Sequence, residues 1–139
     1  MKNNDILLNE IYTNSVTAIN VISAILRKTE KGSMFDCLFD RMLEYREIAD
    51  IAYNLLQNKI PPNNENSLYS HIAVFWTFGK PSSQRLAKIL ISGSKEGFSS
   101  LIDSVNSCTS ATKEARQLAY RLIELEDKNI SEMQKFIKG

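Results

Sequence analysis

Four glutamates in the central parts of predicted helices are the residues of this sequence best suited to chemistry. Glu44 and Glu47 lie three residues apart on one helix, Glu96 lies on the next long helix, and Glu126 lies on the last. With a rise of about 1.5 Å per residue, Glu44 and Glu96 lie roughly 15 Å and 20 Å from the starts of their helices. Because helical bundles bind metals through side chains that project inward at one level, these carboxylates are a candidate site for a divalent metal.

The last predicted helix carries polar atoms in the middle of its apolar face. Apolar residues recur there at steps of three and four, and Glu126 and Asn129 interrupt them. This interruption is the clearest sign of a site in the sequence. The alternative is that the glutamates are surface groups, or are partly buried and paired with arginines: Arg41, Arg46, Arg116 or Arg121.

The elements that would position these residues are four long helices, expected at about 5–29, 34–58, 83–108 and 110–138 from their apolar spacing. A short extra helix is expected at about 68–78, in the connection between the second and third long helices. This connection is the most aromatic part of the chain, with Tyr69, Phe75, Trp76 and Phe78, and would cover one flank of the core. No strand pattern competes, so we predict an all-α four-helix bundle that forms a single domain over residues 1–139.

Residues at the predicted helix ends favour these boundaries. Gly32 is expected to end the first helix, because glycine adopts the left-handed conformation without a Cβ clash. Ser33 and Asp36 form an approximate capping box at the start of the second helix. Ser82 or Ser83 is expected to cap the third long helix, and the fourth would begin directly after it, at residues 109–110.

Two faces of the third long helix suggest different surroundings. Gly93 and Gly97 lie on one face and would allow a close approach by a neighbouring element. Arg85, Lys88 and Lys95 share a polar face without interleaved aromatic residues, which indicates a solvated surface and not a nucleic-acid interface.

Composition and charge exclude several classes of function. The formal net charge is +1, so no strong field would attract nucleic acid or an acidic surface. No apolar run approaches the roughly 20 residues that span a bilayer, so we expect no membrane association. The first five residues are polar and lead directly into a helical pattern, which gives no sign of a signal peptide and favours a cytoplasmic location.

The cysteines and the histidine give little support to other chemistry. Cys37 and Cys108 are far apart in sequence, and His71 is the single histidine, which excludes a structural zinc site by ligand counting. The cysteines are expected to be small buried residues in a reducing compartment, with a disulfide as the alternative. With no nucleophile elbow and no glycine-rich phosphate loop, we predict no catalytic residues, no cofactor and no enzyme activity.

The pattern of helices and carboxylates resembles the ferritin-like superfamily over essentially the whole chain, including a long connection between the second and third helices. Iron proteins of that superfamily carry Glu-x-x-His on the second and fourth helices and a single Glu on the first and third. Glu44, Glu96 and Glu126 stand at glutamate positions of this pattern, whereas Glu47 and Asn129 stand at its histidine positions. The chain is most similar to small bacterial members with a degenerate di-iron site, and its abundance of Asn, Ile and Lys is typical of an AT-rich bacterial genome.

The departures from this pattern predict that a di-iron centre has been lost. At the matching depth the first helix offers Thr17, Ala18 and Asn20, with no carboxylate. A di-iron centre needs about four carboxylates and two imidazoles to hold two cations. A residual single-metal site at Glu44, Glu47, Glu96 and Glu126 is the alternative.

Two topologies are compatible with the connection between the second and third helices. The helices either alternate up-down-up-down, or the connection crosses the length of the bundle and leaves the second and third helices parallel. The resemblance implies the crossover, and we favour it. Up-down-up-down would place Cys37 and Cys108 at the same end of the bundle, whereas the crossover would place them at opposite ends.

Three functions follow as hypotheses. The first is a non-catalytic bundle that serves as a structural or protein-binding module. It would bind a protein partner or self-associate. The second is a carboxylate-rich metal-binding or oxidase protein. The third is a small-molecule binder that uses the aromatic connection around Trp76 and Phe78.

Overall fold

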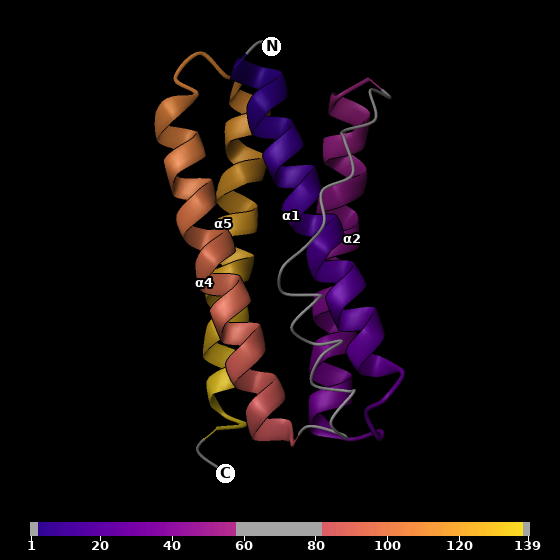
Figure 1. The fold of residues 1–139 in the computed structure, drawn as a ribbon. Helices are drawn as coiled ribbons and strands as arrows, with labels where there is room; N and C mark the ends of the chain where they lie inside the picture. The colour runs from indigo at the N-terminus through magenta and orange to yellow at the C-terminus, as the bar shows by residue number, and fades with distance from the viewer. Residues whose placement is uncertain (1–2, 58–81, 138–139) are drawn as a thin grey trace.

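The computed structural model describes residues 3–57 and 82–137, and these form four helices without a strand (Figure 1). The helices are α1 (Asn3–Leu26), α2 (Ser33–Leu55), α4 (Ser83–Ser107) and α5 (Lys113–Gln134). The prediction of an all-α four-helix bundle is confirmed for this part of the chain. The short helix predicted at 68–78 lies outside the described residues, as does His71. None of the described helices is long and apolar enough to cross a membrane.

The directions of the helices follow from contacts at their ends. At one end of the bundle, Asn3 Nδ2 at the start of α1 donates to Ser110 Oγ, just before α5, over 2.8 Å. At the other end, Gln84 Nε2 in the first turn of α4 donates to the carbonyl of Ile137 over 2.7 Å. Cys37 Sγ, near the start of α2, lies 3.8 Å from Glu132 Oε2, near the end of α5. Both α2 and α4 therefore begin at the end of the bundle where α5 finishes.

The helices α2 and α4 thus run parallel, and the end of α2 and the start of α4 lie at opposite ends of the bundle (Figure 1). This is the arrangement that the crossover topology predicts, and it differs from up-down-up-down. Cys37 and Cys108 consequently lie at opposite ends, and both are free thiols. A disulfide between them is therefore excluded in this fold.

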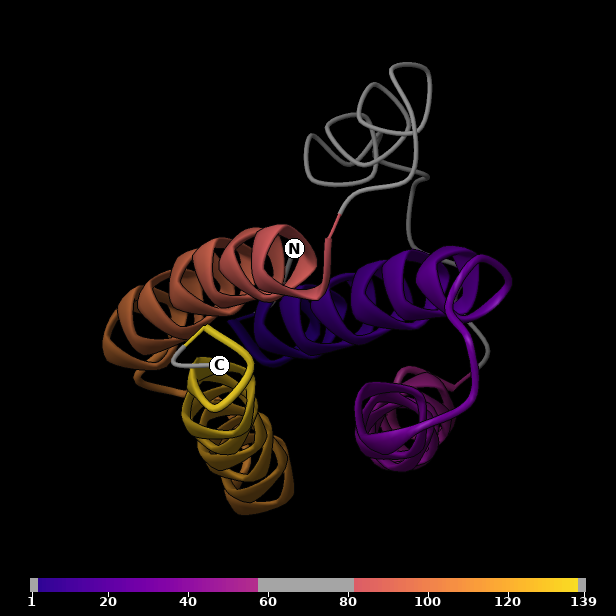
Figure 2. The same cartoon turned by 90° about the horizontal axis from the view of Figure 1, so that it is seen from below.

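The helices pack as two hairpins. Contacts are most extensive between α1 and α2 and between α4 and α5, and they are sparser between α1 and α4. Viewed along the bundle, α1 lies beside α4, and α2 lies beside α5 on the opposite side (Figure 2). The core between them is aliphatic and includes fully buried side chains from every helix, among them Leu7, Ile11, Ile22, Leu38, Ile48, Leu101 and Leu122.

The observed helix starts confirm one cap and correct two others. Ser82 Oγ accepts a hydrogen bond from the amide of Arg85 over 3.2 Å, as predicted for the start of α4. The cap of α5 is Thr112, whose Oγ1 accepts from the amide of Ala115 over 3.2 Å, so α5 starts later than the predicted residue 110. The predicted capping box at Ser33 is wrong, since Gly32 is the N-cap of α2 and no side chain caps that helix.

All four predicted helix ends extended too far: α4 finishes at Ser107 and not at residue 108, and α5 finishes at Gln134 and not at residue 138. The helix α1 finishes at Leu26 and not at residue 29, because the carbonyl of Ile25 accepts from the amide of Lys28 in a tighter turn and from Thr29 Oγ1. The helix α2 finishes at Leu55, and Gln57 follows with a positive φ of 56°, a conformation that terminates a helix.

Candidate functional site

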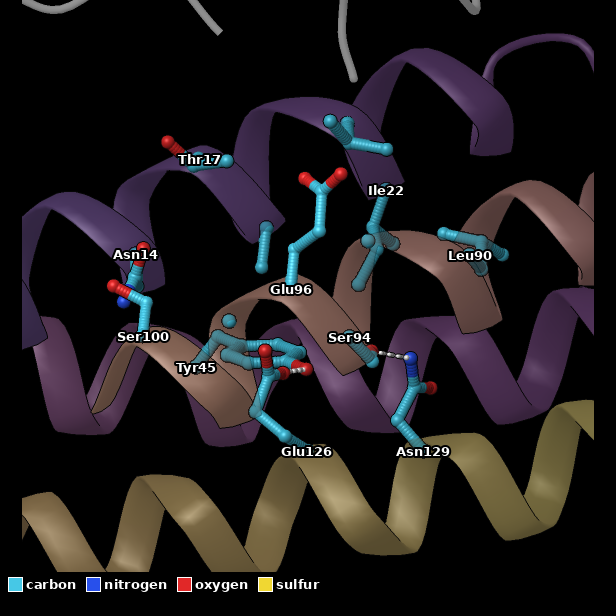
Figure 3. Close-up of a pocket in the computed structure, with 14 residues that line it drawn as sticks. Asn14, Thr17, Ile22, Tyr45, Leu90, Ser94, Glu96, Ser100, Glu126 and Asn129 are labelled. Carbon is cyan, nitrogen blue, oxygen red and sulfur yellow. Dashed lines mark hydrogen bonds between the residues drawn. The ribbon is translucent and has the colours of Figure 1, made fainter. Parts of the chain in front are cut away.

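A carboxylic acid and a phenol meet in the core of the bundle. Glu126 on α5 is 5% exposed and Tyr45 on α2 is 1% exposed. The Tyr45 hydroxyl donates a hydrogen bond to Glu126 Oε1 (Figure 3). Because a buried carboxyl group without a partner is costly, this hydrogen bond stabilises Glu126 in an otherwise apolar interior.

A second pair of polar groups extends this layer to α4. Asn129, one turn after Glu126, donates from Nδ2 to Ser94 Oγ over 2.9 Å. The neighbouring Ser94 hydroxyl acts to lower the pKa of Tyr45, although burial raises this pKa overall. The side chains of α2, α4 and α5 are therefore joined at one level by hydrogen bonds. Within the described part of the chain, the buried Asn129 Oδ1 has no hydrogen-bond partner.

Gly97 on α4 makes room for the Glu126 carboxyl group. A Cβ atom at position 97 would lie far inside van der Waals contact with Glu126 Oε2. The sequence pattern predicted that glycines on this face allow a close approach, and the structure identifies the approaching group at Gly97 as a side chain of α5. Any larger residue at this position would have to displace the buried carboxyl group.

Burial changes the acidity of both members of the Tyr45–Glu126 pair. Loss of solvation raises the pKa of Glu126 from 4.5 to about 7, although the hydrogen bond from Tyr45 acts in the opposite direction. Burial and the neighbouring Glu126 charge raise the pKa of Tyr45 well above its ordinary value. Glu126 therefore exchanges its proton near neutral pH, while Tyr45 stays a hydrogen-bond donor.

This pair faces a cavity of about 240 Å³ between α1 and α4 (Figure 3). Its walls combine aliphatic and small polar side chains from all the described helices. The lining residues are Asn14, Thr17, Ala18, Val21, Ile22, Tyr45, Leu90, Gly93, Ser94, Glu96, Gly97, Ser100, Glu126 and Asn129. Small residues on α1 and α4 leave this space where the two hairpins face each other.

Polar contacts between α1 and α4 close one side of the cavity. Ser100 Oγ donates a hydrogen bond to Glu10 Oε1, and Asn14 Nδ2 lies 3.4 Å from the same oxygen. Glu96 is exposed and extends from α4 in the direction of α1 in Figure 3. Both Glu96 and Glu126 line the cavity, so two of the four glutamates singled out in the sequence are brought to one place.

The other two glutamates lie on the surface between α2 and α5. Glu44 Oε1 lies 3.5 Å from Arg41 Nη2 and 3.4 Å from Lys128 Nζ. Glu47 Oε1 lies 3.1 Å from Arg121 Nη2. The alternative of arginine-paired surface groups is therefore confirmed for Glu44 and Glu47.

Arg116 was one of the predicted partners of the glutamates, and the structure gives it a different role. Its Nη1 lies 3.3 Å from the carbonyl of Cys108 and 3.4 Å from that of Val105. Arg116 therefore satisfies carbonyl groups at the end of α4, where a positive charge is favourable.

The donor set around the cavity does not fit a di-iron centre. In residues 3–57 and 82–137, no three His, Cys, Asp or Glu side chains are grouped so that they could hold a metal ion. Glu126 uses one oxygen to accept from Tyr45, and Asn129 directs its amide nitrogen to Ser94. The described residues of the lining supply two carboxylates and no imidazole, which are too few to hold and neutralise two iron ions.

Some residues of the site could be found in the sequence and others could not. Glu126 and Asn129 were visible because they interrupt an apolar face, and Thr17 lines the cavity at the depth that helix geometry gave it. Tyr45 and Ser94 were missed because each occupies a position of the apolar repeat, where a phenol or a small hydroxyl is compatible with ordinary packing.

Comparison of the chain with protein-family models, with curated protein sequences and with solved structures found no match.

Proposed function

We propose that this chain is a non-catalytic helical bundle that binds a small molecule in the cavity between α1 and α4. The observation that carries the proposal is a buried carboxyl group, Glu126, that lines a cavity next to aliphatic walls. Ligand pockets of proteins typically combine mostly apolar walls with a few placed polar groups. Glu126, Tyr45, Ser94 and Asn129 supply such polar groups, and Val21, Ile22 and Leu90 belong to the apolar walls.

The size of the cavity supports a ligand of modest dimensions. An engineered apolar cavity of about 150 Å³ binds benzene, and this cavity has about 240 Å³. A molecule of roughly six to ten non-hydrogen atoms would therefore fit. The third sequence hypothesis placed a small-molecule site at Trp76 and Phe78, which lie outside the described residues, so the proposed site is a different one.

A cavity-filling variant tests this function. Ala18 lines the cavity from α1, and Ala18→Leu places three additional carbon atoms in it. Ala24, on the same helix and outside the cavity lining, provides the matched control Ala24→Leu. Ligand-observed NMR with a panel of neutral, cationic and anionic fragments should detect binding to the wild type and to Ala24→Leu, and at least tenfold weaker binding to Ala18→Leu. Absence of binding by every fragment, or unchanged binding by Ala18→Leu, would contradict the proposal.

A protein-interaction role is the second candidate, and exposed apolar side chains on α2 favour it. Phe39 is 42% exposed and Leu43 is 47% exposed. Phe35 and Phe39 stack with ring centroids 6.4 Å apart, so these residues form a continuous apolar strip along the outside of the helix. We propose self-association through this strip as the form that such a role would take.

Self-association can be separated from ligand binding by its concentration dependence. The double variant Phe39→Ser/Leu43→Ser should shift the molecular mass in light scattering toward that of one chain. Leu55→Ser removes another exposed apolar side chain of α2 and serves as the control. A wild type that has the mass of one chain at all concentrations would rule out this second role.

We further propose a reducing cytoplasmic setting and a common origin with the ferritin-like superfamily. The free thiols of Cys37 and Cys108 support the former. The parallel directions of α2 and α4, together with Glu96 and Glu126 at one cavity, support the latter.

A further inference from the structure

The cavity between α1 and α4 has an unbalanced charge. Among the described residues that line it, Glu96 and Glu126 carry carboxyl groups and none carries a basic side chain. Glu10 adds a further carboxylate behind Ser100 and Asn14. A molecule that enters this cavity therefore meets acids from α4 and α5 without a countercharge.

The cations of the same level lie outside the cavity lining. Arg41 is buried beside Tyr45 but outside the cavity lining, and it pairs with Glu44. Lys128 also pairs with Glu44, and Arg121 pairs with Glu47. These positive groups belong to α2 and α5, and none of them lines the cavity on the other side of the bundle.

The cavity also offers more free hydrogen-bond acceptors than free donors. Tyr45 directs its only hydrogen to Glu126 Oε1, and Asn129 Nδ2 donates to Ser94. The oxygen atoms of Glu126 and Glu96 are acceptors when ionised, and the buried Asn129 Oδ1 has no donor among the described residues. Such a cavity suits a ligand that brings donors and few acceptors.

We infer that the ligand of this cavity is a small organic cation, an amine of about the size of benzylamine, whose ammonium group pairs with Glu126. This inference rests on the proposed small-molecule function. The hydrocarbon part would lie against Val21, Ile22 and Leu90, and the ammonium supplies three donors to the acceptors beside Tyr45. The positive charge offsets the cost of ionising a carboxyl group that is 5% exposed.

An amine fits this cavity better than a bare metal ion does. The aliphatic walls offer nothing to a divalent cation, and no three metal-binding side chains are grouped in the described helices. An amine uses both parts of the lining, since its charge needs one carboxylate and its carbon frame needs apolar contact. Glu96, at the more exposed side, adds attraction without direct pairing.

Benzylamine and benzyl alcohol test this inference because they share a carbon frame and differ in charge. Chemical-shift titrations of isotope-labelled protein at pH 7.5 should give a dissociation constant at least tenfold lower for benzylamine. In Glu126→Gln this preference should fall to less than threefold, with benzyl alcohol binding about as it does to the wild type. Glu47→Gln removes the same charge at a surface pair and should retain the preference. Circular dichroism would establish that both variants are folded.

The outcomes separate the two proposals. Equal binding of amine and alcohol would overturn the cationic ligand while the small-molecule function survives. An amine preference that survives Glu126→Gln, or that Glu47→Gln weakens equally, would also overturn it, because general surface charge would then be responsible. If neither probe shifts the signals of Ala18, Ile22 and Leu90, both the inference and the proposed function fail.

Discussion

Glutamates on the two sides of the bundle have opposite surroundings. Between α2 and α5, Glu44 and Glu47 are partly exposed and each lies within 4 Å of a cation. Between α1 and α4, Glu126 is buried beside Tyr45, and its cavity has no basic side chain among the described residues. The first arrangement is a network of ion pairs that is largely exposed to water, and the second is a desolvated acid that lines a cavity.

This difference shows that neighbours and burial determine what a glutamate can do. Exposed ion pairs contribute little to stability because water already solvates both charges. A carboxyl group in the core changes its pKa instead and becomes a group that can exchange a proton or pair with a ligand. Helical depth placed both kinds of glutamate near the middle of the bundle, so depth alone did not distinguish them.

Removal of the buried acid should have the largest effect. Between pH 4.5 and about 7, folded Glu126 retains a proton that the unfolded chain has released, so raising the pH through this window lowers the free energy of unfolding. Glu126→Gln should remove that dependence and stabilise the protein by about 3 kcal/mol at pH 8, with little change at pH 4. Urea unfolding of both proteins across this range measures the difference.

The groups around Glu126 define the control for this experiment. Tyr45 faces it from α2 with Arg41 beside the phenol, and Glu96 lies on α4 at the same cavity. Glu96→Gln removes a neighbouring exposed charge and should leave most of the pH dependence in place. Parallel pH profiles for wild type and Glu126→Gln would show that Glu126 is not the titrating group.

An added methyl group at Gly97 should destabilise the protein by about 1–2 kcal/mol, since overpacking a core position commonly costs this much. The change would force the Glu126 carboxyl group from its place. In a Glu126→Ala background the obstruction is gone, and Gly97→Ala should then stabilise by up to about 1 kcal/mol through helix propensity. Thermal or urea unfolding of the four proteins gives both values, and the same sign in both backgrounds would disprove the steric explanation.

Loss of the phenol hydroxyl should cost about 1–2 kcal/mol, because Tyr45→Phe removes the hydrogen bond to a buried carboxyl group. Since that hydrogen bond lowers the pKa of Glu126, the variant should raise this pKa above about 7. An NMR titration of the Glu126 side-chain carbon measures the shift directly. A lower pKa in Tyr45→Phe would mean that the hydroxyl does not stabilise the carboxylate.

The surface pair on the other side of the bundle should give the smallest effect. Arg121→Ala removes the partner of Glu47, and the side chains of both are well exposed. We expect a loss of less than about 0.5 kcal/mol that decreases further at high salt. A loss comparable to that of Tyr45→Phe would show that the two sides differ less than their geometry suggests.

The sequence contained most of the fold and about half of the candidate site. Apolar spacing identified the four long helices because each buries one continuous face, and the polar interruption at Glu126 and Asn129 marked the depth of the site. The sequence pattern did not identify the partner of Glu126, because Tyr45 fits an apolar repeat equally well with or without a hydrogen bond. The cavity was also hidden, since it depends on small residues of α1 and α4 that meet only in the folded bundle.

The limits of the boundary predictions have a similar origin. Both Ser110 and Thr112 have side chains that can cap a helix, and the sequence did not show which hydroxyl would accept the first free amide of α5. In the structure Ser110 accepts from Asn3, while Thr112 caps the helix. Contacts between distant segments therefore decided a local choice.

The parallel course of α2 and α4 has a consequence for folding and for access to the interior. Each hairpin, α1 with α2 and α4 with α5, consists of contacts that are local in sequence and can form rapidly, whereas docking of the hairpins must wait for closure of the long intervening segment. The cavity lies where one hairpin meets the other. A guest molecule can enter from the side where Glu96 is exposed, and a transient separation of the two intact halves would widen this entrance without melting any helix.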